Sequence, residues 1–106
     1  MTARPPELTS ASVLRLCREG GVAHFPGLAR PRHIDCGRCS EAQREELHRL
    51  LANLDEARID GADRRLLRLN LEDAGGVIWS RDVAEELAPP ALWRWWREAK
   101  VEEEEE

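Results

Sequence analysis

The sequence predicts an α+β domain, with a small antiparallel sheet of about four strands, one main amphipathic helix packed on it and a short helix near the carboxyl end. Three observations support this fold class. Two segments alternate apolar and polar residues as half-buried strands do. One segment begins with a helix-capping sequence and then repeats apolar residues at the spacing of a helix. The length of 106 residues suffices for one core. We expect a single domain over residues 1–101 and a disordered acidic tail over residues 102–106.

The first elements are expected to form a hairpin. Residues 12–18 suit a strand, and the Gly20-Gly21 pair behind them suits a turn, because glycine reaches positive φ without a steric clash. Residues 22–25 are apolar enough to be the returning strand. Residues 26–31 then contain two prolines, which lack the N–H that a sheet interior requires, so we expect a loop there with Leu28 in its middle.

A further strand and the main helix follow this loop. Residues 32–36 alternate between apolar and polar side chains and predict a half-buried strand. Ser40-Glu41-Ala42-Gln43 matches a capping box, so a helix is expected to begin at Glu41 and to run to about Leu54. Its leucines recur at the spacing of one helical face, which predicts that this face packs on the sheet. These leucines are Leu47, Leu50, Leu51 and Leu54.

The last part of the chain predicts a second hairpin. Residues 65–72 alternate so that Leu67, Leu69 and Leu71 share one face, and residues 73–76 have the Asp and Gly content of a tight loop. The returning strand is expected to continue the alternation, which would place three apolar residues on the buried face. These residues are Val77, Trp79 and Val83.

A short closing helix is predicted after Pro89-Pro90, because proline is tolerated in the first helical turn. Trp93 and Trp96 have the spacing of a buried face and are expected in the core. Trp95 is expected to be exposed, where it is available to a partner.

Charge and hydropathy exclude several classes of partner. The chain has 16 Lys+Arg and 21 Asp+Glu, for a net charge of −5, and residues 102–106 hold five of the acids, so the body is neutral. Nucleic-acid binders need clustered positive charge, so we expect no nucleic-acid partner. No stretch reaches the roughly 20 apolar residues that span a bilayer, and no signal peptide precedes the domain. We expect no membrane partner, and a cytoplasmic location or export without a classical signal peptide.

Cys36 and Cys39 form a C-x2-C pair, with His33 at the same spacing before it. Two thiolates and an imidazole are ligands that zinc takes, and a fourth could come from Cys17, His24 or His48. The second ligand cluster of a structural zinc site is missing, however, and the strand alternation turns His33 and Cys36 to opposite faces. A redox pair would be expected to open a helix in a βαβ unit. We therefore expect no metal and no cofactor, and keep a small zinc or redox module as an alternative.

Catalytic patterns are also missing from the sequence. Three scattered histidines give no defensible Ser, His and Asp combination, and no glycine-rich loop leads into a helix as a phosphate site requires. We therefore expect a protein that is not an enzyme. A second alternative is a homo-oligomeric adaptor that uses Trp95 and an open sheet edge.

Several short motifs resemble the emfourin family. Emfourins are small protein inhibitors of protealysin-like enzymes, which are zinc metalloproteases of the thermolysin family. The resemblance covers almost the whole chain and implies a compact α+β fold and a non-enzymatic inhibitor-like domain over residues 1–101. The motifs that carry it include Pro6-Glu7-Leu8-Thr9, Arg18-Glu19-Gly20-Gly21-Val22-Ala23 and Phe25-Pro26-Gly27-Leu28-Ala29. The Arg-Glu-Gly-Gly-x-Ala and Pro-x-Leu parts of these motifs are the most specific.

This sequence departs from the family pattern in three places. Cys36 and Cys39 stand where aliphatic residues are expected, the link between the main helix and the next strand is shorter, and the acidic residues 102–106 are foreign to the family. These departures leave the expected fold unchanged. The shorter link could alter which protease is recognised.

The resemblance implies that surface loops occlude the active-site cleft of a thermolysin-like or protealysin-like metalloprotease. Such enzymes prefer a bulky apolar residue just after the scissile bond, so Leu28, Phe25 or Leu8 is a candidate for that pocket, and prolines beside Leu28 would keep the loop stiff. The opposing interpretation is that Phe25 and Leu28 fold back onto the core. The inhibitor is expected to be a monomer when free. The predicted protease-binding residues are Leu8, Glu19, Gly20, Gly21, Phe25, Pro26, Gly27 and Leu28.

Overall fold

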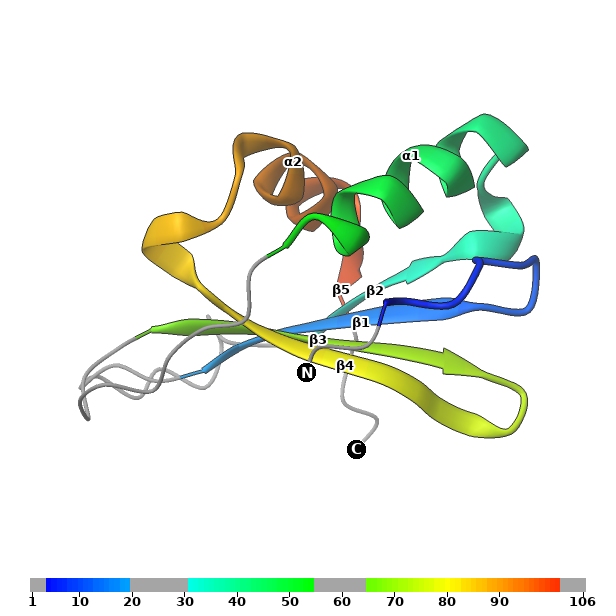
Figure 1. Cartoon of the computed structure of the whole chain (residues 1–106), viewed down its shortest axis with the longest axis horizontal. Coiled ribbons are helices and arrows are strands. Elements are labelled where there is room, and N and C mark those ends of the chain that lie inside the picture. Colours follow the sequence, from blue (N-terminus) through cyan, green and yellow to red (C-terminus); the bar gives the residue numbers. More distant parts are fainter. Residues whose placement is uncertain (1–3, 20–30, 55–64, 102–106) are drawn as a thin grey trace.

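The computed structural model describes residues 4–19, 31–54 and 65–101, which form a five-stranded antiparallel sheet and two α-helices. Both helices lie on one face of the sheet (Figure 1). The strand order is β4-β3-β1-β2-β5. The strands are β1 (Val13–Glu19), β2 (Arg32–Asp35), β3 (Leu66–Asp73), β4 (Gly76–Ala84) and β5 (Lys100–Val101). The α+β fold class predicted from the sequence is confirmed.

The sheet has one strand more than the four predicted, because β5 adds two residues at its edge. Two residues are too few for an apolar alternation to reveal. The predicted strand over residues 22–25 and the predicted tail over residues 102–106 lie outside the described residues. In the described part of the chain, β1 pairs with β2 on one side and with β3 on the other.

The main helix, α1 (Glu41–Ala52), begins where the capping box predicts. The Gln43 amide donates to the Ser40 hydroxyl at 3.1 Å, and the Ser40 amide donates to the Gln43 side chain at 2.8 Å. The helix ends at Ala52, two residues before the predicted end, and Asn53 caps it. Leu54 is nevertheless buried, so the predicted apolar face continues past the last helical turn.

The core lies between the helices and the inward face of the sheet. Leucines of β1 and β3 alternate into it, as predicted for β3, and the helices cover them. Two short 3-10 turns, η1 (Cys36–Arg38) and η2 (Glu85–Leu87), and a second helix, α2 (Pro90–Glu98), complete the described elements. No helix in residues 4–19, 31–54 or 65–101 is long and apolar enough to cross a membrane. The fully buried leucines are Leu14, Leu16, Leu47, Leu51, Leu67, Leu69, Leu71 and Leu92.

The prediction that Val77 is buried was wrong. Leu71 pairs with Trp79 while Glu72 pairs with Val77, so Ile78 is an extra residue in β4. This bulge shifts the alternation by one position. Val77 therefore lies opposite Glu72 and is 58% exposed, whereas Trp79 and Val83 are buried as predicted.

The prediction that Trp95 is exposed was also wrong, since this side chain is only 7% exposed. The buried residues of α2 are Leu92, Trp95 and Trp96, followed by Ala99, which is a spacing of one helical face. Trp93 is half-buried at the margin of that face and packs against the core.

A buried charged side chain lies on the helix-facing side of the sheet. Arg81 lies between Trp79 and Val83 in β4 and is 6% exposed. Its Nη1 donates to the carbonyl oxygen of Leu54 at 2.6 Å, and its guanidinium lies 5.0 Å from the centre of the Trp79 ring. Carbonyls just beyond a helix end lack intrahelical partners and attract cations, so Arg81 joins β4 to the end of α1.

Replacing Arg81 by alanine is expected to lower the free energy of unfolding by about 2 kcal/mol, because a charge-assisted hydrogen bond and the packing of a buried stem are lost together. Urea unfolding followed by circular dichroism measures this. The control is Arg68→Ala, which breaks a more exposed ion pair with Asp82 and should cost about 0.5 kcal/mol. Equal losses for the two variants would contradict a structural role for Arg81.

Candidate functional site

Along the chain, the residues predicted to bind a protease lie before β1, at its last residue and after it. Leu8 precedes the strand, is half-buried and packs against the core, whereas Glu19 is the last residue of the strand. A strand of seven residues spans roughly 20 Å, so Leu8 and Glu19 are not brought together. The other predicted residues lie outside the described ranges. They are Gly20, Gly21, Phe25, Pro26, Gly27 and Leu28.

The segment that carries Leu8 is held against the body of the domain. His48 of α1 donates through Nε2 to the carbonyl oxygen of Pro5, with 2.9 Å between the two atoms. Farther along, the backbone passes so close to η1 that a Cβ atom at Gly37 would lie 2.7 Å from the carbonyl oxygen of Ser10. These contacts fix the path of the segment, so Leu8 is positioned by the core on which it packs.

Arg18 and Arg32 lie just before and just after residues 20–30, which contain most of the predicted protease-binding residues. The Nε and Nη2 atoms of Arg18 donate to the two carboxylate oxygens of Glu85 at 3.0 and 2.9 Å. This hydrogen bonding raises the pKa of Arg18 above its ordinary value, against the opposing effect of burial. Arg32 donates through Nη1 to the carbonyl oxygen of Trp96 at 2.9 Å. Both ends of the segment are therefore tied to the part of the fold that follows β4.

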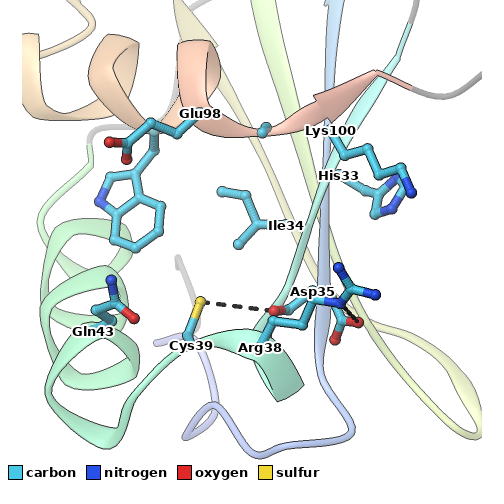
Figure 2. Close-up of a pocket in the computed structure, with 10 residues that line it drawn as sticks. His33, Ile34, Asp35, Arg38, Cys39, Gln43, Glu98 and Lys100 are labelled. Atoms are coloured by element: carbon cyan, nitrogen blue, oxygen red, sulfur yellow. Dashed lines mark hydrogen bonds and ion pairs between the residues drawn. The ribbon is translucent and has the colours of Figure 1, made fainter.

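A cavity of about 380 Å³ lies between β2, η1 and the end of α2 (Figure 2). Ile34 forms an apolar part of its wall, and Glu98 and Lys100 place an acidic and a basic side chain in its lining. The Asp35 carboxylate accepts a hydrogen bond from the Gly37 amide at 2.9 Å and lies 4.0 Å from the Arg38 guanidinium. The Asp35 carboxylate at this cavity is thus already engaged with the protein.

The cysteine pair lies beside this cavity without forming a ligand cluster. Cys36 is fully buried, and the Cys39 thiol donates to the carbonyl oxygen of Asp35 at 3.7 Å. His33 lies beside Lys100 and away from Cys39 in Figure 2. Cys17 alternates with the inward Leu16 on β1 and so lies on the outer face of the sheet. Among the residues described, no three His, Cys, Asp or Glu side chains are grouped to hold a metal.

The Cys36 and Cys39 thiols are also poor nucleophiles. Burial raises the pKa of the Cys36 thiol from an ordinary value of 9.0 to about 11. Burial likewise raises the pKa of Cys39. Reactive or metal-binding cysteines instead have stabilised thiolates. The described residues therefore favour neither the zinc nor the redox alternative, while His24 lies outside them.

A sequence model of the emfourin family matches residues 16–100. This chain belongs to the emfourin family. Among solved structures, it is similar to emfourin (M4in) from Serratia proteamaculans, an M4 family peptidase inhibitor, with 27% identity over 96% of this chain and 100% of that chain and a TM-score of 0.48. No curated protein sequence matches.

The family match confirms the resemblance that the sequence motifs indicate, and it includes both arginines that flank residues 20–30. Sequence reasoning named Arg18 as part of a motif in this emfourin chain but did not foresee the contacts that Arg18, Arg32 and Glu85 make. The two arginines could have been recognised from the sequence, because they lie next to residues 20–30. No local signal identifies Glu85, because it lies 67 residues from Arg18 in the sequence.

The raised pKa of Cys36 predicts slow alkylation. At pH 8 a thiol of pKa about 11 holds roughly hundredfold less thiolate than an unperturbed one, and burial slows attack further. Iodoacetamide labelling followed by peptide mass spectrometry should show Cys36 reacting at least roughly hundredfold more slowly in the folded protein than in urea. Equal rates would show that Cys36 is open to reagent and that its pKa is not raised.

Proposed function

We propose that this emfourin inhibits an M4 family, thermolysin-like metallopeptidase by occluding its active-site cleft, and that it does so without being an enzyme itself. The observation that carries the proposal is the family match over residues 16–100. The target class comes from the Serratia proteamaculans emfourin, which is an M4 family peptidase inhibitor. The choice of cleft occlusion rests on the sequence of residues 20–30.

The proposed contact is substrate-like. Phe25 or Leu28 would occupy the pocket that accepts a bulky apolar side chain, and the flanking prolines would limit the entropy lost on binding. The described residues support one aspect of this mechanism. Residues 20–30 leave from β1 and return to β2, which are neighbouring antiparallel strands, so both ends attach to the same part of the sheet.

We also propose that the free inhibitor is a monomer. The adaptor alternative relied on an exposed Trp95 and an open sheet edge, and the Trp95 side chain is buried in the core. Light scattering during size-exclusion chromatography tests the proposal. A dimeric mass across a tenfold dilution series would contradict it.

Titration against thermolysin with a fluorogenic peptide tests the proposed activity. We expect activity to fall to near zero at one inhibitor per enzyme, because a cleft holds one occluding domain. Intact mass spectrometry of the recovered domain should show an uncut chain. If thermolysin and a protealysin-like enzyme both keep full activity, or if the domain is consumed as a substrate, the proposed function is wrong.

Replacing Leu28 by aspartate is expected to abolish inhibition, because a carboxylate is costly to bury in an apolar pocket. Inhibition is compared with that of Leu87→Asp, which changes another leucine that is 72% exposed and lies in η2. Circular dichroism at the assay temperature checks that both variants are folded. Full inhibition by folded Leu28→Asp would remove this residue from the mechanism.

A further inference from the structure

We propose that the open edge of β2 binds an extended peptide segment of another protein, which adds to the sheet as a further strand. The cavity of about 380 Å³ between β2, η1 and the end of α2 is the site of this contact. The segment that fits it alternates apolar and acidic side chains. This proposal goes beyond peptidase inhibition and does not depend on it.

The edge of β2 is only partly covered in the described part of the chain. β5 pairs with Arg32 and His33 of β2. The chain before β5 is the end of α2, so it leaves the sheet at this point. Among the described strands, none covers this edge of Ile34 and Asp35, the last two residues of β2. An edge of this kind offers unpaired backbone groups to another chain.

Asp35 turns its backbone groups toward this open edge. The amide of Cys36 donates to the carbonyl oxygen of Ser12 at 3.0 Å, so these two residues form a hydrogen-bonded pair across β1 and β2. Asp35 faces Val13 at the next position, and bonded and non-bonded pairs alternate in an antiparallel ladder. The N–H and C=O of Asp35 therefore point away from β1. The Cys39 thiol, which lines the cavity, donates to this same C=O at 3.7 Å.

A peptide residue opposite Asp35 can form two backbone hydrogen bonds with it. The Asp35 N–H donates to the peptide carbonyl oxygen, and the peptide N–H donates to the Asp35 carbonyl oxygen. A thiol is a weak donor, so a peptide amide can replace the contact from Cys39. The Asp35 side chain leaves the edge accessible because it accepts from the Gly37 amide at 2.9 Å.

The cavity accommodates apolar side chains of such a peptide. Successive side chains of a strand point to opposite faces, so the neighbours of the residue opposite Asp35 point to the helix-covered face. Ile34, Trp95 and Ala99 line the cavity and are buried. A volume of about 380 Å³ lies within the range of about 300–1,000 Å³ that is typical of ligand pockets. We therefore expect apolar residues at these peptide positions.

The charges around the cavity select the remaining side chains. Glu98, Lys100 and Arg38 line the cavity and are exposed. Lys100 and Arg38 lie on the side of Ile34 opposite Glu98 (Figure 2). Arg38 also partly neutralises the Asp35 carboxylate, at 4.0 Å. An acidic side chain at the peptide position opposite Asp35 would therefore meet two cations, which makes an alternating apolar and acidic segment complementary to this edge.

A nuclear magnetic resonance titration with synthetic peptides tests the proposal. The probe is a short acetylated and amidated peptide that alternates leucine and glutamate, and its control alternates leucine and lysine. The glutamate peptide should shift the Asp35 amide, slow its exchange with solvent and bind roughly tenfold more tightly than the lysine peptide. Methylating the backbone nitrogens of the glutamate peptide should weaken binding roughly tenfold, because the donors are lost.

Two variants at one position isolate the backbone contact. Asp35→Pro removes the N–H donor, and the φ of −85° at Asp35 is within about 20° of the value that proline imposes. Asp35→Ala is the matched control, because it loses the same carboxylate but keeps the N–H. The proline variant should bind the glutamate peptide roughly tenfold more weakly than the alanine variant. Cys39→Phe, which fills the cavity, should also weaken binding and serves if the proline variant does not fold.

The proposal is overturned if the glutamate peptide leaves the Asp35 amide unshifted at millimolar concentration. Equal binding by folded Asp35→Pro and Asp35→Ala, or by folded Cys39→Phe and the wild type, would also overturn it. Equal binding of the glutamate and lysine peptides would show that the partner is not acidic. If the Asp35 amide shifts when the protein alone is concentrated and light scattering shows a dimer, the edge binds a second copy and the proposed partner is wrong.

Discussion

Burial of one sheet face beneath two helices is the constraint on which the rest of the structure depends. Side chains alternate along a strand, so a slip of one residue in β1 would exchange the buried Leu14 and Leu16 for Arg15 and Cys17. Leu14 faces Leu71 and Leu16 faces Leu69 across the β1–β3 pair. These leucine pairs fix the register of the central strands, and that register sets where the ends of the strands lie.

Arginines then join the sheet to the helices at the margins of this core. Arg81 donates to a carbonyl just after α1, and Arg32 donates to a carbonyl in the last turn of α2. Both acceptors lie at the negative end of a helix dipole, where a cation is favourable. Arg18 reaches a carboxylate instead, and its pair with Glu85 is the contact nearest the end of β1. Charged contacts therefore join the sheet to the helices at the margin of the apolar core.

The sequence predicts those parts of the fold that a local period or cap controls. The leucine alternation of β3 and the capping box at Ser40 are confirmed because each depends on neighbouring residues alone. Val77 was misplaced because a bulge changes the phase of the alternation, and Trp95 because periodicity does not show which side of a helix meets a sheet. The burial of Arg81 depends on a carbonyl 27 residues away, which no local pattern reveals.

The candidate site also has a part that local sequence motifs indicate and a part that only the fold reveals. Motifs that resemble the emfourin family point to residues 20–30, which lie outside the described residues. The Arg18–Glu85 contact beside them joins side chains 67 residues apart, so only the fold reveals it. Cys36 shows that the core of the domain can vary without changing the fold. It is a fully buried thiol in a position where the family resemblance implies an aliphatic residue, and it packs as a small apolar group. Differences in target among emfourins should therefore arise in the segments between the strands and in the contacts that hold their ends.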